Sequence, residues 1–506
     1  MSITSLGFLL FIVAGLFIYY LLPHKYKWVF LLVMSFIFYS VSDIRNVIFI
    51  LAFTCSSYFY SKIIESKLCK NTIQIGGGTG KSLSAKSIVI FAIITDVLIL
   101  FLVKYLPEIL PFNYSIQQHS KFLKYFMPIG ISYYTLMSIS YVLDVYWEKT
   151  KAEHNFFKLM LFTGYFPLLV QGPISKWGQL SQEFFKEHKF NFINIKFGAQ
   201  LMLWGFFKKL IISDRCGLWV NGMMSSSHEL PYGAEAVLVL IFYAIQLYAD
   251  FSGGIDIIRG VSECFDVKIT ENFRQPYFSK SLGEFWRRWH ISLGAWMKDY
   301  IFYPIALSKT CSRFKKSLKK HGFNSKIANQ LSFAFADLVV FFLVGLWHGA
   351  ASKFILWGMY NGIILAFSEL MKEVYIKQKK LLHINESSIL WNGFCIFRTI
   401  LIVLVGYCFD ITANGGQAVE LFCNIFTSGP SVWQYASITK SGILLVAFSS
   451  LILLVVDILN DKGMSIRDKL NKKNYFIQVL VWSFILQLLF LFGKVSSDGG
   501  FMYANF

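Results

Sequence analysis

The sequence has few charged residues and no paired cysteines, and each shortage excludes a class of protein. Only 15% of the 506 residues are charged, whereas 55% are hydrophobic and 18% are aromatic. Together with a mean hydropathy of +0.53, this composition excludes an ordinary soluble protein and is typical of a polytopic membrane protein. The eight cysteines form no CxxC pair. We therefore expect the cysteines to be small buried core residues and not metal ligands.

Long apolar windows recur along the whole chain. A window of roughly 17 to 25 apolar residues is long enough to cross the hydrocarbon core, and about twelve such windows begin near residues 5, 28, 46, 87, 123, 195, 235, 333, 353, 394, 441 and 475. There is no internal repeat, and no loop is long enough to form a soluble domain. We therefore predict one all-α integral membrane domain over residues 1–506, with about 11–12 transmembrane helices.

The net charge of +19 is concentrated in particular loops, which argues against nucleic acid as the partner. The positive-inside rule explains this distribution better and predicts that the basic loops are cytoplasmic. These loops are residues 61–86, with five lysines, 309–326, with seven basic residues and no acid, 372–380, with four basic residues, and 459–475, with five.

Other loops have almost no basic charge and are predicted to face outward. They are residues 107–121, 214–234 and 411–440, with one basic residue each. The assignments agree only if both termini lie outside, and if residues 158–174 and the opening apolar segment do not fully cross. We therefore expect these two segments to be re-entrant or to lie in the membrane plane. The opening segment lacks a basic region and a cleavage site, so we expect no cleaved signal.

Two of the nine histidines lie in apolar sequence. The other seven fall in predicted loops, where solvated surface positions are expected: His24, His119, His154, His188, His228, His321 and His383. His290 and His348 each follow a tryptophan. An ionisable group at membrane depth is costly and usually functional, although a hydrogen-bonded structural histidine is the alternative. Imidazole can accept and return a proton near neutral pH, which suits a general base.

His290 lies in EFWRRWHISLGAWMKDY, residues 284–300, which the spacing of its aromatic residues predicts to be one amphipathic helix. Its aromatic face comprises Trp286, Trp289, Leu293 and Trp296. Such a helix could be an interfacial anchor, with tryptophans at headgroup level and arginines near anionic lipid. The same cationic, cytoplasm-facing region would also suit the entrance for an anionic donor such as a coenzyme bearing phosphates.

Two aspartates interrupt another apolar window. QLYADFSGGIDIIRG, residues 246–260, contains Asp250 and Asp256 beside two glycines. Charge combined with a break in an apolar helix predicts backbone that bends around a cavity. The structural alternative is a helix end with its cap.

Five ordered blocks between Pro128 and Gly362 carry a family resemblance: PIGISYYTLMSISYVLDVYW, YFPLLVQGPISKW, QLYADFSGGIDIIRG, ENFRQPYFSKSLGEFWRRWHISLGAWMKDYIFYPI and VGLWHGAASKFILWGMYNG. With them the chain resembles the membrane-bound O-acyltransferase family, and within it the bacterial alginate O-acetylation branch. The family-like core covers about residues 123–371. The resemblance implies a helical fold around a central tunnel that admits an acyl donor from one side and an acceptor hydroxyl from the other.

The resemblance also implies roles for individual residues. The family's two hallmark histidines match His348, expected to be the principal catalytic residue, and His290, its partner on the donor side. Residues in the matching blocks that we expect to bind the donor are Trp286, Arg287, Arg288, Trp289, Lys298 and Asn272. Asp250, Asp256 and Asn361 are tunnel or helix-break candidates.

The family's chemistry implies acetyl-CoA as the donor substrate, with no tightly bound cofactor. It further implies a multi-pass protein of a bacterial plasma membrane that works with an extracytoplasmic esterase-like acyltransferase. Tyr503, in the ending GGFMYANF, matches a position that carries an acyl group in related systems, although a simple hydrophobic tail is an alternative. The sequence departs from many relatives at Asp410, where an arginine is common, and at residues 306–308, where two glycines are common.

Two other functions are compatible with these residues. The first is D-alanyl transfer toward teichoic acid from a carrier protein, which is the reaction of a sister branch. The second is transport, with His290 and His348 as proton-relay groups. A transporter would be expected to have an inverted repeat, which the sequence lacks.

Overall fold

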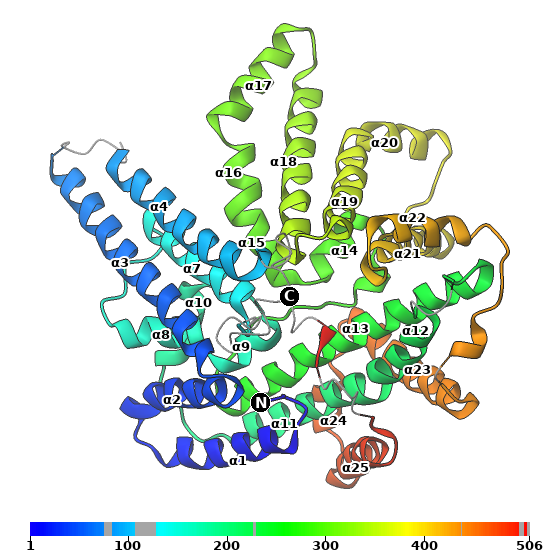
Figure 1. Ribbon diagram of the computed structural model, residues 1–506, viewed down its shortest axis with the longest axis horizontal. Helices are drawn as coiled ribbons and strands as arrows, with labels where there is room; N and C mark the ends of the chain where they lie inside the picture. The colour runs from blue at the N-terminus through cyan, green and yellow to red at the C-terminus, as the bar shows by residue number, and fades with distance from the viewer. Residues whose placement is uncertain (75–82, 107–127, 226–228, 437, 495–499, 503–506) are drawn as a thin grey trace, which may run out of the picture. The chain divides into compact units, whose positions relative to one another are not determined.

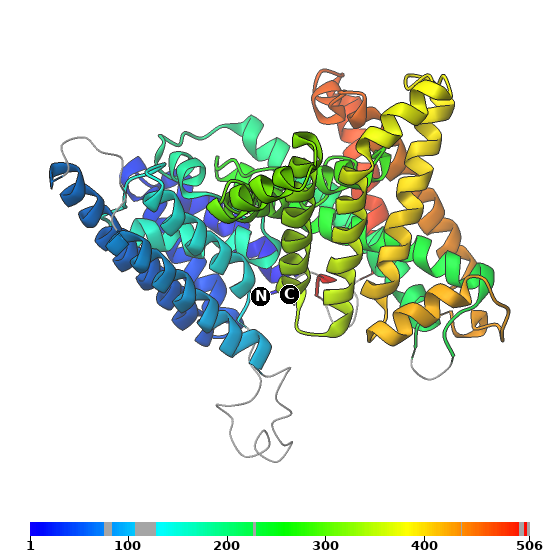
Figure 2. The same cartoon turned by 90° about the horizontal axis from the view of Figure 1, so that it is seen from above.

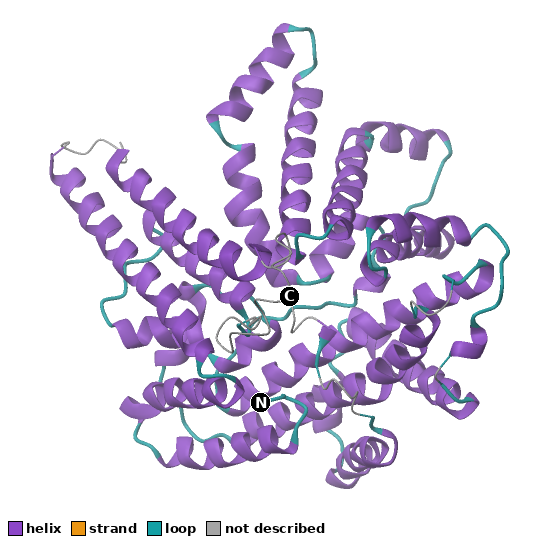
Figure 3. Ribbon diagram, viewed as in Figure 1, coloured by secondary structure: helices purple, strands orange, loops and turns teal. Residues whose placement is uncertain are grey.

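The computed structural model describes residues 1–74, 83–106, 128–225, 229–436, 438–494 and 500–502. These residues form helices joined by loops, with one isolated β-bridge between Phe273 and Trp289 (Figure 3). The prediction of an all-α polytopic membrane protein is therefore confirmed.

Seven helical segments of the described chain are long and apolar enough to span a membrane, or eight if a bent pair counts as one span. The seven are Arg45–Cys69, Ala85–Tyr105, Gly233–Cys264, Ser325–His348, Ile389–Ile411, Lys440–Asp461 and Tyr475–Phe492. The bent pair is Ser352–Leu370 with Lys372–Leu381. The number is smaller than the number of apolar windows because some windows fold as shorter helices. The first window, for example, forms a helix of 16 residues, Leu6–Leu21.

The chain divides into two compact units, and the first comprises residues 1–207, 251–270 and 479–506. Within it α3 (Arg45–Gln74), α4 (Leu83–Leu100) and α7 (Ile131–Tyr146) pack side by side (Figures 1 and 2). Its helices are α1 (Leu6–Leu21), α2 (His24–Ser42), α3 (Arg45–Gln74), α4 (Leu83–Leu100), η1 (Phe101–Tyr105), α7 (Ile131–Tyr146), α8 (Phe156–Gly164), α9 (Phe166–Gln171), α10 (Trp177–Phe185) and α11 (Phe192–Phe206).

Two short helices, α8 and α9, occupy most of residues 158–174. They have nine and six residues and are separated at Tyr165. At about 1.5 Å per residue, neither approaches the roughly 30 Å of a hydrocarbon core. Neither helix alone is long enough to cross, and the absence of a full crossing by this segment stays a prediction.

The second unit comprises residues 208–250 and 271–478. Its helices are α12 (Asp214–Met223), η3 (Pro276–Phe278), α14 (Leu282–Arg288), α15 (Ile291–Met297), η4 (Lys298–Phe302), α16 (Tyr303–Ala306), α17 (Lys309–Lys320), α18 (Ser325–His348), α19 (Ser352–Leu370), α20 (Lys372–Leu381), α21 (Ile389–Ile411), α22 (Gly415–Asn424), η5 (Trp433–Tyr435), α23 (Lys440–Asp461) and α24 (Ile466–Asn471). Three helices contain residues of both units, namely η2 (Phe207–Ser213), α13 (Gly233–Cys264) and α25 (Tyr475–Phe492).

The helices α18 and α19 form a hairpin whose tip begins at His348 (Figure 1). Asn324 caps the start of α18 by accepting a hydrogen bond from the Lys326 amide. The basic helices α17 and α20 lie at the ends of α18 and α19 that are opposite the tip (Figure 1). Residues 309–320 were expected to form a loop, but they fold as α17. Ser308 caps the start of this helix, and most of the residues that follow have a high helix propensity.

Glycines allow the two hairpin helices to approach closely. A Cβ atom added at Gly345 would lie 2.5 Å from the backbone oxygen of Phe354, and one at Gly358 would overlap the backbone oxygen of Phe341. Close helix contacts through small residues are typical of membrane proteins, in which dispersion contacts and hydrogen bonds replace the hydrophobic effect between helices. These contacts hold His348 in place relative to α19.

The predicted helix break between Asp250 and Asp256 is wrong. Both residues lie within α13, which continues through the two glycines as one helix of 32 residues. Gly254 allows close packing and does not bend the helix. A Cβ atom added at Gly254 would overlap the side chain of Gln171. Small residues let neighbouring segments approach a helix closely in membrane proteins.

Substituting Gly358 by alanine is expected to loosen the hairpin. The new methyl group would meet backbone, which cannot rotate away, so we expect a loss of about 1–3 kcal/mol in stability. The thermal midpoint of the purified protein in detergent measures this effect. The matched control is Gly393→Ala in α21, where nothing lies within 4 Å of an added Cβ atom. An equal midpoint for both variants would contradict the packing role.

Candidate active site

The chain around His290 is bent into a tight clamp, so the prediction of one amphipathic helix over residues 284–300 is wrong. The helix ends at Arg288 and restarts at Ile291, with His290 between them at φ +45°. Two backbone hydrogen bonds hold this bend: Arg274 N donates to Arg288 O at 2.9 Å, and Ile291 N donates to Asn272 O at 3.0 Å. Tertiary hydrogen bonds therefore override the local helical spacing. They also hold His290 in a left-handed conformation that costs on the order of 1–3 kcal/mol.

The side chain of Asn272 is the centre of the clamp. Its Oδ1 accepts hydrogen bonds from the backbone N–H and the hydroxyl of Ser292, both at 2.9 Å, and lies 3.3 Å from His290 Nδ1. A backbone N–H can only donate, so the atom that it contacts must be the amide oxygen. His290 Nδ1 must then carry the proton and donate it to Oδ1. The lone pair of the neutral imidazole is consequently on Nε2.

Burial keeps His290 neutral. Its side chain is 4% exposed, and burial lowers its pKa from the ordinary 6.5 to about 3. The cause is desolvation, which disfavours the charged imidazolium. A neutral ring with a defined tautomer is able to accept a hydrogen bond through Nε2 at physiological pH.

Aromatic rings connect the two histidines within the second unit. The ring of Trp347 lies edge-on to both, with centroids 6.2 Å from His290 and 5.1 Å from His348. His348 is 8% exposed and also contacts Trp357 at 5.1 Å and Phe354 at 6.1 Å. The structure thus brings the two histidines that the sequence isolated close to the same indole.

The residues expected to bind the donor differ in exposure. Trp289 is buried at 3% exposure, and Asn272 is fully buried. Arg288 is half-buried in ion pairs with Glu284 at 2.8 Å and Asp461 at 2.6 Å. Arg287 and Lys298 are exposed, whereas Trp286 is half-buried with its ring 5.5 Å from that of Trp357. Their roles in donor binding remain predictions.

Asp250 is part of a buried charge cluster in the second unit. Lys209 Nζ contacts Asp250 at 2.7 Å and Asp214 at 2.8 Å, and the Ser213 hydroxyl donates to Asp250 at 3.3 Å. Although burial opposes a charged lysine, the two carboxylates raise the pKa of Lys209. Pairing of this kind compensates the cost of burying ions.

The other tunnel candidates and the unusual Asp410 have local partners. Asp256 lies 3.8 Å from Arg259, three positions along the same helix, and Asn361 donates to the carbonyl oxygen of Trp357 at 2.9 Å. The Asp410 carboxylate accepts a hydrogen bond from the Tyr243 hydroxyl at 2.7 Å. These contacts are compatible with structural roles.

One histidine predicted to be solvated is buried. His188 is 3% exposed, its Nδ1 lies 3.1 Å from Asp266, and its Nε2 lies 3.3 Å from the carbonyl oxygen of Phe184. The loop assignment for His188 holds, but contacts from a distant segment cover it. His119 and His228 lie outside the described residues, as does Tyr503.

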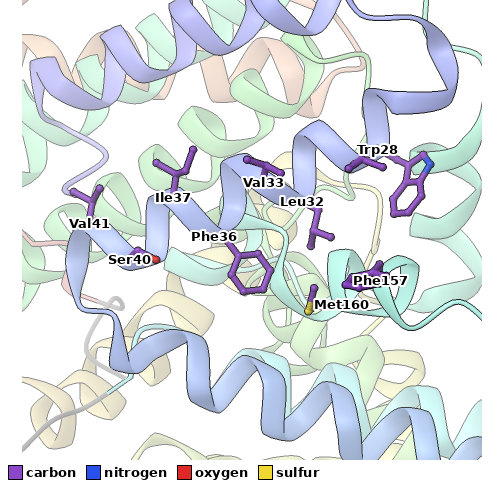
Figure 4. A pocket seen from close by; sticks show the side chains of 10 residues that line it. Trp28, Leu32, Val33, Phe36, Ile37, Ser40, Val41, Phe157 and Met160 are labelled. Carbon is purple, nitrogen blue, oxygen red and sulfur yellow. The ribbon is translucent and has the colours of Figure 1, made fainter.

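A groove in the first unit carries no acid–base group. It runs along α2 and is completed by Phe157 and Met160 of α8 (Figure 4), with a volume of about 820 Å³. Its lining side chains are apolar except for Ser40 and the indole N–H of Trp28. The groove therefore offers no acid–base group that could activate the hydroxyl of Ser40.

Two residues of the site were missed from the sequence. Ser292 supplies two of the hydrogen bonds to Asn272, and Trp357 lies against His348. Both belong to blocks that carry the family resemblance. Their position in those blocks was the available signal, but nothing in their spacing indicates which atoms they contact.

Comparison with known proteins adds an independent line of support. The model of the membrane-bound O-acyltransferase family matches residues 16–407. A probable alginate O-acetylase of Pseudomonas aeruginosa is 27% identical over 458 residues, which cover 88% of this chain and 78% of the relative. A peptidoglycan O-acetyltransferase of Helicobacter pylori is 29% identical over 58% of each chain. A teichoic acid D-alanyltransferase of Bacillus subtilis is 27% identical over 54% of this chain and 66% of the relative.

The low pKa of His290 predicts a pH-dependent contribution to stability. Between pH 6.5 and about 3 the unfolded chain binds a proton at this residue that the folded chain excludes. The contribution of His290 to the free energy of unfolding is therefore lost as pH falls through this window, by up to about 1.4 kcal/mol per pH unit. The His290→Asn variant is a suitable reference, because asparagine does not titrate and tolerates the left-handed backbone conformation.

Thermal midpoints of both proteins from pH 7.5 to 4.5 test this expectation. The advantage of the wild type over His290→Asn is expected to shrink below pH 6.5, because all other titrating groups are common to both proteins. A constant difference across the range would show that His290 is not held neutral by burial.

Proposed function

The chain belongs to the membrane-bound O-acyltransferase family, and from this membership we propose that it transfers an acetyl group from cytoplasmic acetyl-CoA to a hydroxyl of a cell-surface polysaccharide. It is a multi-pass membrane protein and an O-acyltransferase. The observation that carries the proposal is the pair of buried histidines beside Trp347, one of them with a defined neutral tautomer.

The names of the relatives support the acetyl group and the class of acceptor. Both the alginate O-acetylase and the peptidoglycan O-acetyltransferase are named for acetyl transfer to polymers of the cell envelope. The alginate relative is matched over 88% of this chain, whereas the D-alanyltransferase is matched over 54%. The longer match favours acetyl transfer over D-alanyl transfer, and the relatives favour a bacterial plasma membrane.

In the proposed reaction His348 acts as general base. It removes the proton from the acceptor hydroxyl as the oxygen attacks the thioester carbonyl carbon. The resulting tetrahedral intermediate collapses with cleavage of the C–S bond, and the thiolate of coenzyme A leaves and takes up the proton. His290, on the donor side, accepts a hydrogen bond through Nε2 and stays neutral.

The charge distribution supports an orientation for the hairpin. The basic helices α17 and α20 lie at the ends of α18 and α19 opposite His348 (Figure 1), and basic segments favour the cytoplasm. The 24 residues of α18 extend about 36 Å at about 1.5 Å per residue. His348 would then lie far from the cytoplasmic ends and toward the acceptor side, with both chain termini outside.

The basic cytoplasmic segments would attract the phosphates of coenzyme A, with Arg287 and Lys298 as exposed cations near His290 in the sequence. On the opposite side, an esterase-like acyltransferase outside the membrane would pass the acetyl group to the polymer, or the polymer would be acetylated directly. This partner follows from the family resemblance.

His348→Ala is expected to abolish most acetyl transfer, because general base catalysis contributes about 10²–10⁴-fold to rate. The measurement is transfer of label from acetyl-CoA to envelope polysaccharide by membranes, together with acetate released from the polymer by base. His321→Ala is the matched control, because His321 is an exposed histidine of the same unit.

Normal polymer acetylation by a correctly folded His348→Ala protein would refute the central role of this residue. Transfer from an aminoacylated carrier protein, without transfer from acetyl-CoA, would replace the proposal with D-alanyl transfer.

A further inference from the structure

The amide of Asn272 has two ends with different surroundings. Its oxygen is saturated by Ser292 and His290. Its amino nitrogen, Nδ2, is buried and has no hydrogen-bond acceptor among the described residues. The whole side chain is 0% exposed, so bulk water does not hydrate this group.

A buried amino group without an acceptor is costly. Leaving such a donor unsatisfied costs on the order of 1–3 kcal/mol, and native structures retain few of these groups without a functional reason. The amide cannot relieve the cost by turning over, because its oxygen would then be replaced by a nitrogen facing the Ser292 N–H. The clamp thus holds two N–H bonds in a fixed direction beside His290.

We propose that Asn272 is a catalytic residue whose Nδ2 donates a hydrogen bond to the carbonyl oxygen of the bound acyl thioester. This inference rests on the proposed function, because it requires a thioester donor next to His290. As the acceptor oxygen attacks, the C=O bond becomes a C–O⁻ bond, and the negative charge develops on the atom that Nδ2 contacts. When the C–S bond breaks, the C=O bond re-forms and the charge leaves with the thiolate.

The fixed position of the amino group makes it effective. A preorganised donor stabilises a developing oxyanion without reorganisation during the reaction, and removal of one such donor costs about 10²–10³ in kcat. The oxygen of the same amide sets the tautomer of His290. One side chain therefore prepares the imidazole and polarises the carbonyl at the same time.

Asn272→Asp separates these two functions. Aspartate keeps the oxygen that accepts from Ser292 and His290 but replaces the amino group with a second acceptor. We expect kcat with acetyl-CoA to fall by about 10²–10³, with a smaller change in KM and an unchanged thermal midpoint. A kcat within a few-fold of the wild type would overturn the proposal.

Asn424→Asp is the matched control. Asn424 is another buried asparagine of the second unit, on α22, and its Nδ2 also lacks a partner among the described residues. None of its hydrogen bonds involves His290, Asn272 or Ser292. We expect its kcat to match the wild type, and an equal loss in both variants would overturn the specific role of Asn272.

A spectroscopic test removes the effect of the added charge on turnover. Carbonyl-labelled acetyl-CoA is bound to the His348→Ala protein, and its C=O stretch is measured by infrared spectroscopy with Asn272 and with Asn272→Ala. The band is expected at lower frequency when the amide is present, because a hydrogen bond weakens the C=O bond. Identical bands would overturn the proposal. If the wild type does not turn over acetyl-CoA, the proposed function fails instead, which the other outcomes do not imply.

Discussion

A single acceptor, the Oδ1 atom of Asn272, organises the site around His290. It takes hydrogen bonds from two atoms of Ser292 and contacts the imidazole. In an apolar interior each of these donors would otherwise be costly to bury. The bend at His290, its left-handed backbone and its tautomer all depend on this arrangement, which the backbone hydrogen bonds from Arg274 and Ile291 reinforce.

The second constraint is the close packing of α18 against α19. Backbone oxygens of Phe341 and Phe354 occupy the space that side chains at Gly358 and Gly345 would need. This contact places Phe354 and Trp357 of α19 against the ring of His348. His348 is thus supported by rigid helices, although it lies at the end of one of them.

Several buried ionisable groups elsewhere in the described residues have partners close by. Lys209 is paired with two carboxylates, and in the first unit Asp96 accepts hydrogen bonds from Ser56 and Ser138. His188 is likewise enclosed by Asp266 and a backbone carbonyl. The amino group of Asn272 differs from these groups, because it has no acceptor among the described residues and lies beside His290.

The sequence alone was sufficient to identify the class of the protein and the two candidate histidines of the site. Hydropathy is a local property that twenty consecutive residues express without tertiary context, and His290 and His348 are the histidines that fall in apolar sequence. The blocks that contain them also predicted the family, which the match over residues 16–407 confirmed.

Only the tertiary structure decided the conformation at His290, the continuity of α13 and the burial of His188. In each case a contact from a distant segment overrides the local pattern: Asn272 bends a segment with helical spacing, Gln171 fills the space beside a glycine, and Asp266 covers a loop histidine. Spacing along a chain determines which face of a helix a residue occupies. It cannot determine which partner from elsewhere in the fold will complete its hydrogen bonds, because that depends on how the whole chain packs.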